Sequence, residues 1–234
     1  MIVTIYGSGS SGNMTIVKDK ETGKCIVLDC GVHIPPMIKL EDVLGVFITH
    51  AHSDHTHCMS EWISKPIYGT LGELNNPKFI KFNYDFRYIT PLNLYQIGPF
   101  SVIPYPARHD TTDPVHYMVR TNNDSLWYGC DACAYNNQEY HAAITCNKIM
   151  VECNYDEDMV EKGIFKQREY PPSLVERIVD VGHASNQYIE KRFHDVKRKL
   201  ILCHISRNCN EAKRIKKVFG KNIRMVYDCP RRIK

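Results

Sequence analysis

Five side chains that can bind metal ions fall within one short segment, Thr49-His50-Ala51-His52-Ser53-Asp54-His55-Thr56-His57. His50 and His52 are separated by one residue, so on an extended backbone their side chains point the same way and can hold one metal ion. Asp54 and His55 come after the turn and can face a second metal ion nearby. Imidazole and carboxylate groups suit zinc, iron or manganese. A His-rich surface loop is the alternative interpretation, but HxHxDH directly after an apolar β-like run favours a metal site.

A two-metal site needs more ligands, and each of them is expected at the end of a strand. His109 follows the β-like run 101–105, Asp131 follows 126–130 and His204 follows 199–203. The carboxylate of Asp131 could bridge both metals. Any one of these three side chains could instead be structural. Together with HxHxDH they complete two three-ligand sites and a bridge.

Short β-like runs must position these side chains, and they dominate the first two thirds of the chain. Each run is rich in Val, Ile, Tyr or Phe and is bounded by turn residues. The predicted strands are 2–6, 14–18, 24–28, 45–49, 66–69, 100–105, 115–120, 125–128, 149–153 and 199–203. Residues 20–23 predict a hairpin turn between the second and third of them.

Helical patterns come later in the chain. Ser185 is expected to cap a helix over 186–196, and residues 210–219 carry apolar positions at helical spacing. The 234 residues contain neither an internal repeat nor a Pro/Gly/Ser-rich linker. This mixture predicts an α/β or α+β fold in a single domain over 1–234.

The glycine motif Gly7-Ser8-Gly9-Ser10-Ser11-Gly12 fits GxGxxG directly after a strand. A dinucleotide site would require a helix to begin at the last glycine. The strand-like run 14–18 follows instead. We therefore interpret the motif as a tight loop that joins two strands, with glycines at positive φ.

The 10 cysteines and 11 histidines together suggest metal or thiol chemistry. The only CxxC pair, Cys130 and Cys133, has no second pair to complete a zinc ribbon. Most of the other cysteines sit in apolar runs, which favours buried, inert thiols. The first residues resemble neither a signal peptide nor an anchor, and no window reaches the roughly 18 apolar residues of a membrane span. We therefore expect a cytoplasmic protein without a membrane partner and with reduced cysteines.

The net charge of +4 hides an uneven distribution. Residues 197–234 hold 13 Lys/Arg against 2 Asp/Glu, a local balance of +11, whereas residues 1–196 have a balance of −7. A basic C-terminal segment could contact a phosphate backbone. It could equally be a solvated helix face followed by a frayed tail.

HxHxDH followed by single His, Asp and His residues at strand ends resembles the metallo-β-lactamase fold. The resemblance covers the chain from Met1 to about His204. It implies a four-layer αβ/βα sandwich with two mixed β-sheets and with the metals at one edge. It also implies that Asp29 is a buried acid that supports the metal loop without being a ligand. The implied ligands are His50, His52 and His109 for the first metal, Asp54, His55 and His204 for the second, and Asp131 as the bridge.

Finer motifs resemble the YycJ-like branch of this family. They are Ser8-Gly9-Ser10-Ser11-Gly12-Asn13, His109-Asp110 with Asp113-Pro114-Val115, Glu152-Cys153-Asn154-Tyr155-Asp156, and Gly182-His183-Ala184-Ser185-Asn186. The resemblance implies a metal-dependent 5′ exonuclease activity on DNA. Two divalent ions, zinc or manganese or else iron, would share a bridging hydroxide that attacks phosphorus in line.

We expect His183 to protonate the leaving oxygen as a general acid, because it lies in a loop just before a helix start. It could instead only pack or cap. Ser10, Ser11 and Asn13 could offer donors near the site or only shape the turn. The predicted substrate is a nucleic acid or nucleotide phosphodiester, and a homodimer is compatible with the sequence. A small-molecule phosphodiesterase that cleaves cyclic nucleotides, as viral members of this fold do in immune evasion, is the second hypothesis. A non-enzymatic, metal-stabilised nucleic-acid-binding module is the third.

Overall fold

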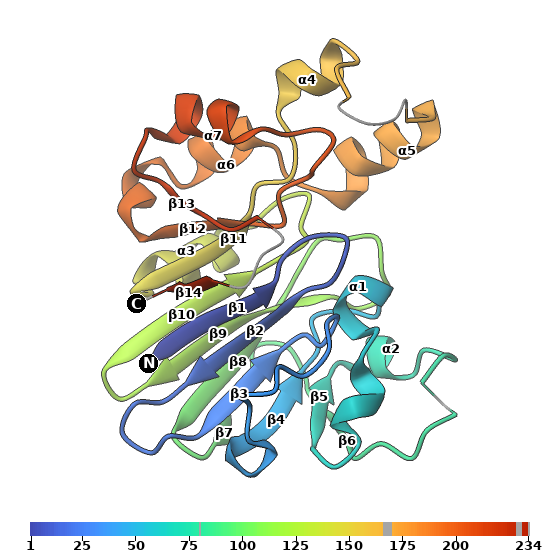
Figure 1. Cartoon of the computed structure of the whole chain (residues 1–234), viewed down its shortest axis with the longest axis vertical. Helices are drawn as coiled ribbons and strands as arrows, with labels where there is room; N and C mark the ends of the chain where they lie inside the picture. The colour runs from blue at the N-terminus through green and yellow to red at the C-terminus, as the bar shows by residue number, and fades with distance from the viewer. Residues whose placement is uncertain (80, 166–169, 228–230, 234) are drawn as a thin grey trace.

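The computed structural model describes residues 1–79, 81–165, 170–227 and 231–233, and these residues form two seven-stranded sheets (Figure 1). The first sheet has the order β14-β1-β2-β3-β4-β5-β6, and the second has the order β13-β12-β11-β10-β9-β8-β7. The strands of the first sheet are β1 (Ile2–Gly7), β2 (Met14–Lys18), β3 (Cys25–Leu28), β4 (Val43–Phe47), β5 (Ile67–Gly69), β6 (Phe86–Tyr88) and β14 (Arg231–Ile233). Those of the second are β7 (Tyr95–Ile97), β8 (Phe100–Pro106), β9 (Val115–Thr121), β10 (Asp124–Gly129), β11 (Lys148–Glu152), β12 (Leu200–Cys203) and β13 (Arg224–Met225).

Both sheets are mixed. In the first sheet β1, β2 and β3 pair antiparallel, and β3, β4, β5 and β6 pair parallel. In the second sheet β7 to β10 pair antiparallel, and β10 to β13 pair parallel. Ligands in open α/β sheets bind beyond the carboxyl ends of parallel strands. The loops after β4, β10, β11 and β12 are therefore the places where a site is expected.

The two sheets pack face to face on a shared apolar core. Phe47 of the first sheet and Tyr117 of the second are fully buried there, with ring centroids 5.6 Å apart in an edge-to-face arrangement. Such aromatic pairs add to the free energy gained by burying their area. In Figure 1 strands β1 to β3 lie across strands β8 to β10.

Short helices cover the outer faces of the two sheets. Trp62 packs with the outer residues of the first sheet, and Ile189 and Ile215 pack with those of the second. The layers therefore run helix, sheet, sheet, helix, which confirms the predicted sandwich. The α-helices are α1 (Ser53–Thr56), α2 (Leu71–Leu74), α3 (Asn137–Thr145), α4 (Glu157–Glu161), α5 (Pro172–Arg177), α6 (Asn186–Arg192) and α7 (Ala212–Phe219). The 3-10 helices are η1 (Leu40–Asp42), η2 (Met59–Trp62) and η4 (His194–Lys199), and η3 (Ile178–Gly182) is a π-helix.

Each of the ten predicted strands overlaps an observed strand, and the largest shift is in β4. That strand was expected over 45–49 but spans Val43–Phe47. Thr49 lies beyond it because its backbone N–H and hydroxyl donate to the buried carboxylate of Asp29. The sequence did not predict β6, β7, β13 and β14, which have only two or three residues each.

The loop between β1 and β2 confirms our interpretation of the glycine motif. Gly9 and Gly12 have φ of 138° and 142°, and Gly12 donates to the carbonyl of Gly9. No helix begins at Gly12, since the chain enters β2 at Met14. The predicted hairpin turn before β3 is also present, with Gly23 at a φ of 72°.

The predicted helices need two corrections. The Ser185 hydroxyl accepts from the backbone N–H of Tyr188 and caps α6, as expected. The helix ends at Arg192 and not at residue 196, because Phe193 leaves helical geometry and a 3-10 helix follows. The second predicted helix, 210–219, begins at Ala212. Helix α3 was not predicted, although Asn136 and Glu139 form a capping box at its start.

The cysteines lie mainly in the core. Nine of them are free thiols in the described part of the chain, and Cys133 alone among these is half-buried while the rest are buried. Within the same part of the chain, no helix is long and apolar enough to cross a membrane. The single domain over 1–234 stays a prediction.

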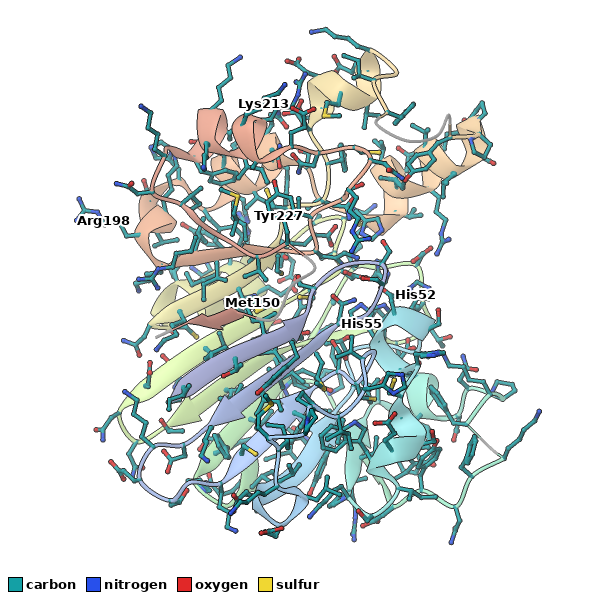
Figure 2. The ribbon with its side chains drawn as sticks, viewed as in Figure 1. His52, His55, Met150, Arg198, Lys213 and Tyr227 are labelled. Atoms are coloured by element: carbon teal, nitrogen blue, oxygen red, sulfur yellow. The ribbon has the colours of Figure 1, made fainter. Side chains whose placement is uncertain are left out.

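The basic C-terminal segment, 197–234, includes residues 228–230 and 234, which lie outside the described residues. Figure 2 places Arg198 and Lys213 of this segment on the outer side of the helical layer over β12 and β13. His52 and His55 lie well apart from them in the same view. The basic residues labelled there are therefore remote from the histidine cluster.

Candidate metal centre

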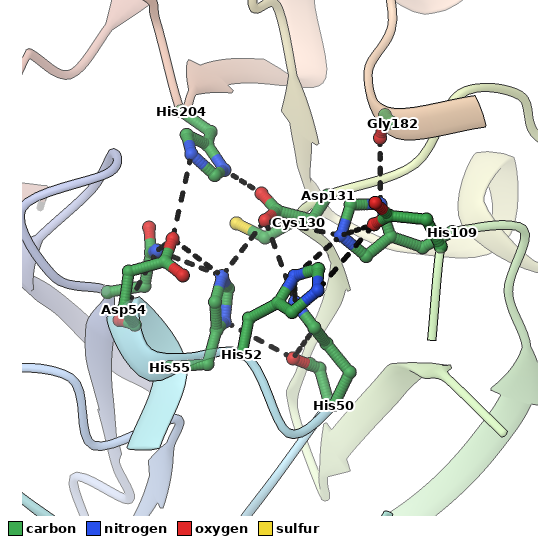
Figure 3. A network of polar contacts seen from close by, with 12 residues as sticks. His50, His52, Asp54, His55, His109, Cys130, Asp131, Gly182 and His204 are labelled. Carbon is green, nitrogen blue, oxygen red and sulfur yellow. Dashed lines mark hydrogen bonds and ion pairs between the residues drawn. The ribbon is translucent and has the colours of Figure 1, made fainter. Parts of the chain in front are cut away.

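Seven side chains that were predicted as metal ligands meet beyond the strand ends (Figure 3). The loop after β4 carries His50 and His52, and α1 carries Asp54 and His55. His109 comes after β8, Asp131 after β10 and His204 after β12. The parallel pairing of β10, β11 and β12 brings the last two to one edge, since neighbouring parallel strands end together.

Three imidazoles form the first group. The Nδ1 atom of His52 lies 3.1 Å from Nε2 of His50 and 3.1 Å from Nε2 of His109. Oδ2 of Asp131 lies 3.7 Å from Nε2 of His50 and 3.9 Å from that of His109. One ligand atom of each of these four residues lies within 4.8 Å of all the others.

The second group shares Asp131 with the first. Nε2 of His55 lies 3.1 Å from Oδ2 of Asp131 and 3.5 Å from Oδ2 of Asp54. His204 places Nε2 3.9 Å from Asp54 and contacts Asp131 with its Nδ1 atom. Asp131 therefore lies between two sets of His and Asp donors, which is the position predicted for a bridge.

Burial favours the uncharged form of three imidazoles in the two groups. It lowers the pKa of His50 well below the ordinary value, and the neighbouring imidazoles lower it further. Burial lowers the pKa of His109 to about 3, with His183 adding to the effect, and lowers that of His204 to about 3 as well. An imidazole that is uncharged at neutral pH keeps a lone pair for a metal ion.

The carboxylate of Asp54 remains ionised. Burial raises the pKa of Asp54, but the imidazoles of His55 and His204 outweigh burial and hold that pKa well below its usual range. The site thus offers imidazole nitrogen and carboxylate oxygen ligands, which zinc, manganese and iron all accept. Nitrogen atoms that face one another at 3.1 Å without a carboxylate between them suit a shared cation. The donor set therefore fits divalent metals.

Asp29 lies beneath the metal loop and is fully buried. Its Oδ2 atom lies 2.8 Å from Nδ1 of His55 and accepts from the hydroxyl of Tyr128 at 3.0 Å. Its Oδ1 atom accepts from the backbone N–H of Thr49 at 2.9 Å. A carboxylate on the far nitrogen of a ligating histidine fixes the ring and its tautomer. Asp29 can thus support His55 without reaching the metal.

Backbone strain is concentrated at this edge. Asp29, Asp131 and His204 have φ of 60°, 56° and 47°, in the left-handed region that costs free energy for residues other than glycine. Each of them directly follows, or lies within two residues of, the end of a strand. The sharp turn aims the side chain across the sheet edge and toward the other donors.

The loop before β2 holds the Asp54 segment in place. The Nδ2 atom of Asn13 donates to Oδ2 of Asp54 at 3.0 Å and lies 2.9 Å from Nε2 of His55. The backbone N–H of Asn13 donates to the carbonyl of Asp54 at 2.6 Å. A Cβ atom on Gly31 would lie 1.7 Å from that same carbonyl oxygen, so only glycine fits there. Of the three polar residues predicted in the glycine loop, Asn13 contacts the site and Ser10 lines its cavity.

A cavity of about 470 Å³ lies over the two groups. The metal-loop side chains form its floor, and its wall comes from the segment that includes α5 and η3. Arg177 lines the cavity and pairs with Asp110, while the backbone carbonyl of Gly182 accepts from Nδ1 of His109 at 2.7 Å. Only the Gly182-His183 part of this wall was noted from the sequence, and α5 was not predicted. Tyr170, Leu174 and Ile178 line it too.

His183 also lines the cavity, next to a buried acid that the sequence analysis assigned no role. Its Nδ1 atom lies 2.8 Å from Oε1 of Glu152, which is fully buried at the end of β11. Oε2 of Glu152 accepts from the backbone N–H of Ala132 at 2.8 Å, next to Asp131. Burial lowers the pKa of His183, but Glu152 outweighs burial and raises it above the ordinary value. Glu152 could have been found by the rule that located Asp131 and His204, since it too ends a parallel strand.

Comparisons with known proteins agree with the observed fold. The family model described as the metallo-beta-lactamase superfamily matches residues 7–143. The chain is 26% identical over 226 residues to the exodeoxyribonuclease YycJ of Bacillus anthracis, covering 88% of this chain and 83% of the relative. It is 24% identical over 230 residues to the exodeoxyribonuclease WalJ of Streptococcus pneumoniae serotype 2, covering 88% and 82%. The solved structure of Zn(2+)-bound PqqB from Methylobacterium extorquens superposes with a TM-score of 0.74 at 12% identity, over the whole of both chains.

Proposed function

The chain belongs to the metallo-beta-lactamase superfamily, and we propose that it is a metal-dependent phosphodiesterase that hydrolyses nucleic acid, with a 5′ exonuclease activity on DNA. Superfamily membership and relatives named as hydrolases make it a metallo-hydrolase. Both curated relatives carry the name exodeoxyribonuclease, which supports the choice of substrate.

The observation that carries the proposal is the shared carboxylate of Asp131. It belongs to a group with His50, His52 and His109 and to another with Asp54, His55 and His204. A paired site is suited to phosphodiesters, because both the attacking and the leaving oxygen develop charge there. Divalent metals held by these residues would supply a nucleophile at neutral pH and would neutralise charge on the phosphate.

Two further residues of the cavity contribute to phosphate binding and to proton transfer. Arg177 can place its guanidinium on a phosphate oxygen, since it lines the cavity and is half exposed. His183 is our proposed general acid, because its ring lines the same cavity and Glu152 favours its protonated form. The proton would pass from the His183 ring to the leaving oxygen of the substrate.

A panel of phosphodiesters tests the proposal. Wild-type protein and Asp54→Ala are assayed on single- and double-stranded DNA, on RNA and on cyclic mono- and dinucleotides. We expect hydrolysis of DNA that a chelator abolishes and that manganese or zinc restores, and we expect Asp54→Ala to remove it. Asp195→Ala changes an exposed acid of η4 and serves as the control. A fully metal-loaded protein that cleaves neither DNA nor RNA would contradict the proposal.

A small-molecule phosphodiesterase for cyclic nucleotides is the second candidate. The volume of about 470 Å³ favours it, because cavities of this size hold single small ligands. The same panel separates the two functions. Cleavage of cyclic nucleotides without cleavage of DNA would select the second.

A further inference from the structure

A second hollow shares a lining residue with the metal cavity. Its volume is about 230 Å³, and its lining includes Ser53, Thr56, Lys78, Phe82 and Tyr84. Ser53 also lines the metal cavity, so the two spaces meet at this residue. Ser53 is the first residue of α1 and is exposed. We call this space the aromatic hollow.

We propose that the aromatic hollow binds an unpaired nucleotide of a single-stranded nucleic acid whose cleaved phosphodiester lies in the metal cavity. The inference rests on the proposed function for its position beside the cleaved bond, and it narrows the substrate to a single-stranded polymer. A strand that runs from the metal cavity past Ser53 enters the aromatic hollow directly.

The aromatic side chains supply a face on which a base can stack. Phe82 is 46% exposed, and its ring centroid lies 5.3 Å from that of Tyr84. Tyr84 is half-buried and its ring lies 5.2 Å from that of Phe86, which fixes it from behind. A rigid inner ring beside an exposed outer ring is a stacking surface that tolerates any base.

A lysine supplies positive charge to the aromatic hollow. The ammonium group of Lys78 donates to the carbonyl of Ala51, which lies between His50 and His52, and to the hydroxyl of Thr56 at 2.9 Å. An ammonium group has three N–H donors, so one more can face a phosphate of the strand. Lys78 thus ties the lining of the aromatic hollow to the metal loop.

The chemistry selects a single strand over a duplex. Bases within a duplex are stacked on one another, so their faces cannot cover Phe82 unless they are unpaired. Occupation of the aromatic hollow should therefore appear with single strands and not with duplexes.

Fluorescence anisotropy tests the inference without turnover. The full chain is titrated, in the presence of a chelator, against a labelled single-stranded oligothymidylate of about ten residues and against a labelled duplex of the same length. We expect Phe82→Ala to raise the Kd of the oligothymidylate by about tenfold, the loss of one stacked base, with a much smaller effect on the duplex. Phe82→Trp should retain tight binding, and its tryptophan fluorescence should be quenched by the oligothymidylate.

Tyr88→Ala is the matched control. Tyr88 lies on β6, is 52% exposed and lines neither space, so its removal should leave the Kd unchanged. Equal Kd values for Phe82→Ala and wild type, together with unquenched fluorescence in Phe82→Trp, would overturn the inference. Binding is measured without catalysis, so the two proposals can fail separately. If Phe82 contributes to binding but the protein cleaves no phosphodiester, the subsite is supported and the proposed function is refuted.

Discussion

Asp29 and His55 form a fully buried pair in which Oδ2 of the acid lies 2.8 Å from Nδ1 of the imidazole. Burial lowers the pKa of His55, but the carboxylates of Asp29 and Asp54 outweigh it and raise that pKa well above its ordinary value. The acid thus directs the other ring nitrogen, Nε2, toward Asp131. This contact joins the metal loop to its support, together with the hydrogen bonds that Thr49 donates to Asp29.

Asp29→Asn should weaken metal binding without unfolding the chain. Asparagine tolerates the left-handed φ of 60° found at this position, and its oxygen can still accept from Thr49. Its amide loses the negative charge that supports His55, so we expect metal affinity to fall about 10- to 100-fold. Isothermal titration with zinc or manganese measures the change, and circular dichroism reports on the fold.

The matched control for this variant is Asp19→Asn. Asp19 is a buried acid of the same sheet that accepts from Thr22 in the hairpin before β3. The Asp19→Asn substitution should leave metal affinity unaltered. If the two variants bind metal equally well, Asp29 does not support the site.

The strand ends explain how much of this site the sequence could predict. Asp131 and His204 were located because each follows an apolar run, and parallel pairing then brings such positions together. The same rule applies to Glu152 at the end of β11, which was noted as part of a motif but was given no role, because the resembling pattern assigns it no metal. The roles of the predicted ligands and of His183 stay predictions.

The cavity wall and the short elements could not be predicted. Helix α5 has no buried residue, so it lacks the periodic apolar stripe by which helices are recognised. Arg177 reaches the site only because its helix folds back over His109 through the Gly182 contact, a long-range arrangement that local sequence does not encode. Strands β6 and β7 have three residues each, too few to show an alternating pattern.

Arg177→Gln should weaken substrate binding. The guanidinium lines the cavity and is half exposed, so a phosphate can replace or share its present partner, Asp110. A hydrogen bond to a charged group contributes about 1.5–3 kcal/mol, so we expect KM to rise about tenfold or more and kcat to change less. Steady-state kinetics on a DNA oligonucleotide provides the measurement.

Arg87→Gln is the control for Arg177. Arg87 is also exposed and paired with an aspartate, Asp85, but it lies on β6 and lines neither cavity. Its substitution should leave KM at the wild-type value. A similar rise in both variants would indicate a general effect of net charge rather than a phosphate contact.

The stability of the fold should depend on Asp124 at neutral pH and lose that dependence in acid. Burial raises the pKa of Asp124, but the ammonium of Lys148, 2.5 Å away, outweighs it and holds the pKa below its ordinary value. Because the pKa of Asp124 is lower in the folded protein than in the unfolded chain, its carboxylate stabilises the fold at pH values above the ordinary pKa. This stabilisation is lost as the pH falls through the pKa of the folded protein. We expect Asp124→Asn to lower the free energy of unfolding by about 1 kcal/mol near neutral pH.

Urea denaturation of wild type and Asp124→Asn at a series of pH values measures this difference. The two free energies of unfolding should converge as the pH falls below 3.8. Asp195→Asn replaces an exposed acid and should give a curve parallel to that of the wild type. A difference in the free energy of unfolding that grows in acid would contradict a lowered pKa for Asp124.

A change of leaving group should reveal whether His183 acts as a general acid. The ring lines the metal cavity, and Glu152 holds it at 2.8 Å, so a proton can be delivered to a leaving oxygen. General acid catalysis contributes about 10²- to 10⁴-fold when the leaving group is poor. We expect His183→Ala to lower kcat by that factor on DNA but by far less on a p-nitrophenyl phosphodiester, whose leaving group departs without a proton. Metal content, measured on the same samples, should stay at the wild-type value, and Glu152→Gln should give a smaller version of the same pattern. An equal loss on both substrates would assign His183 to packing or metal binding instead.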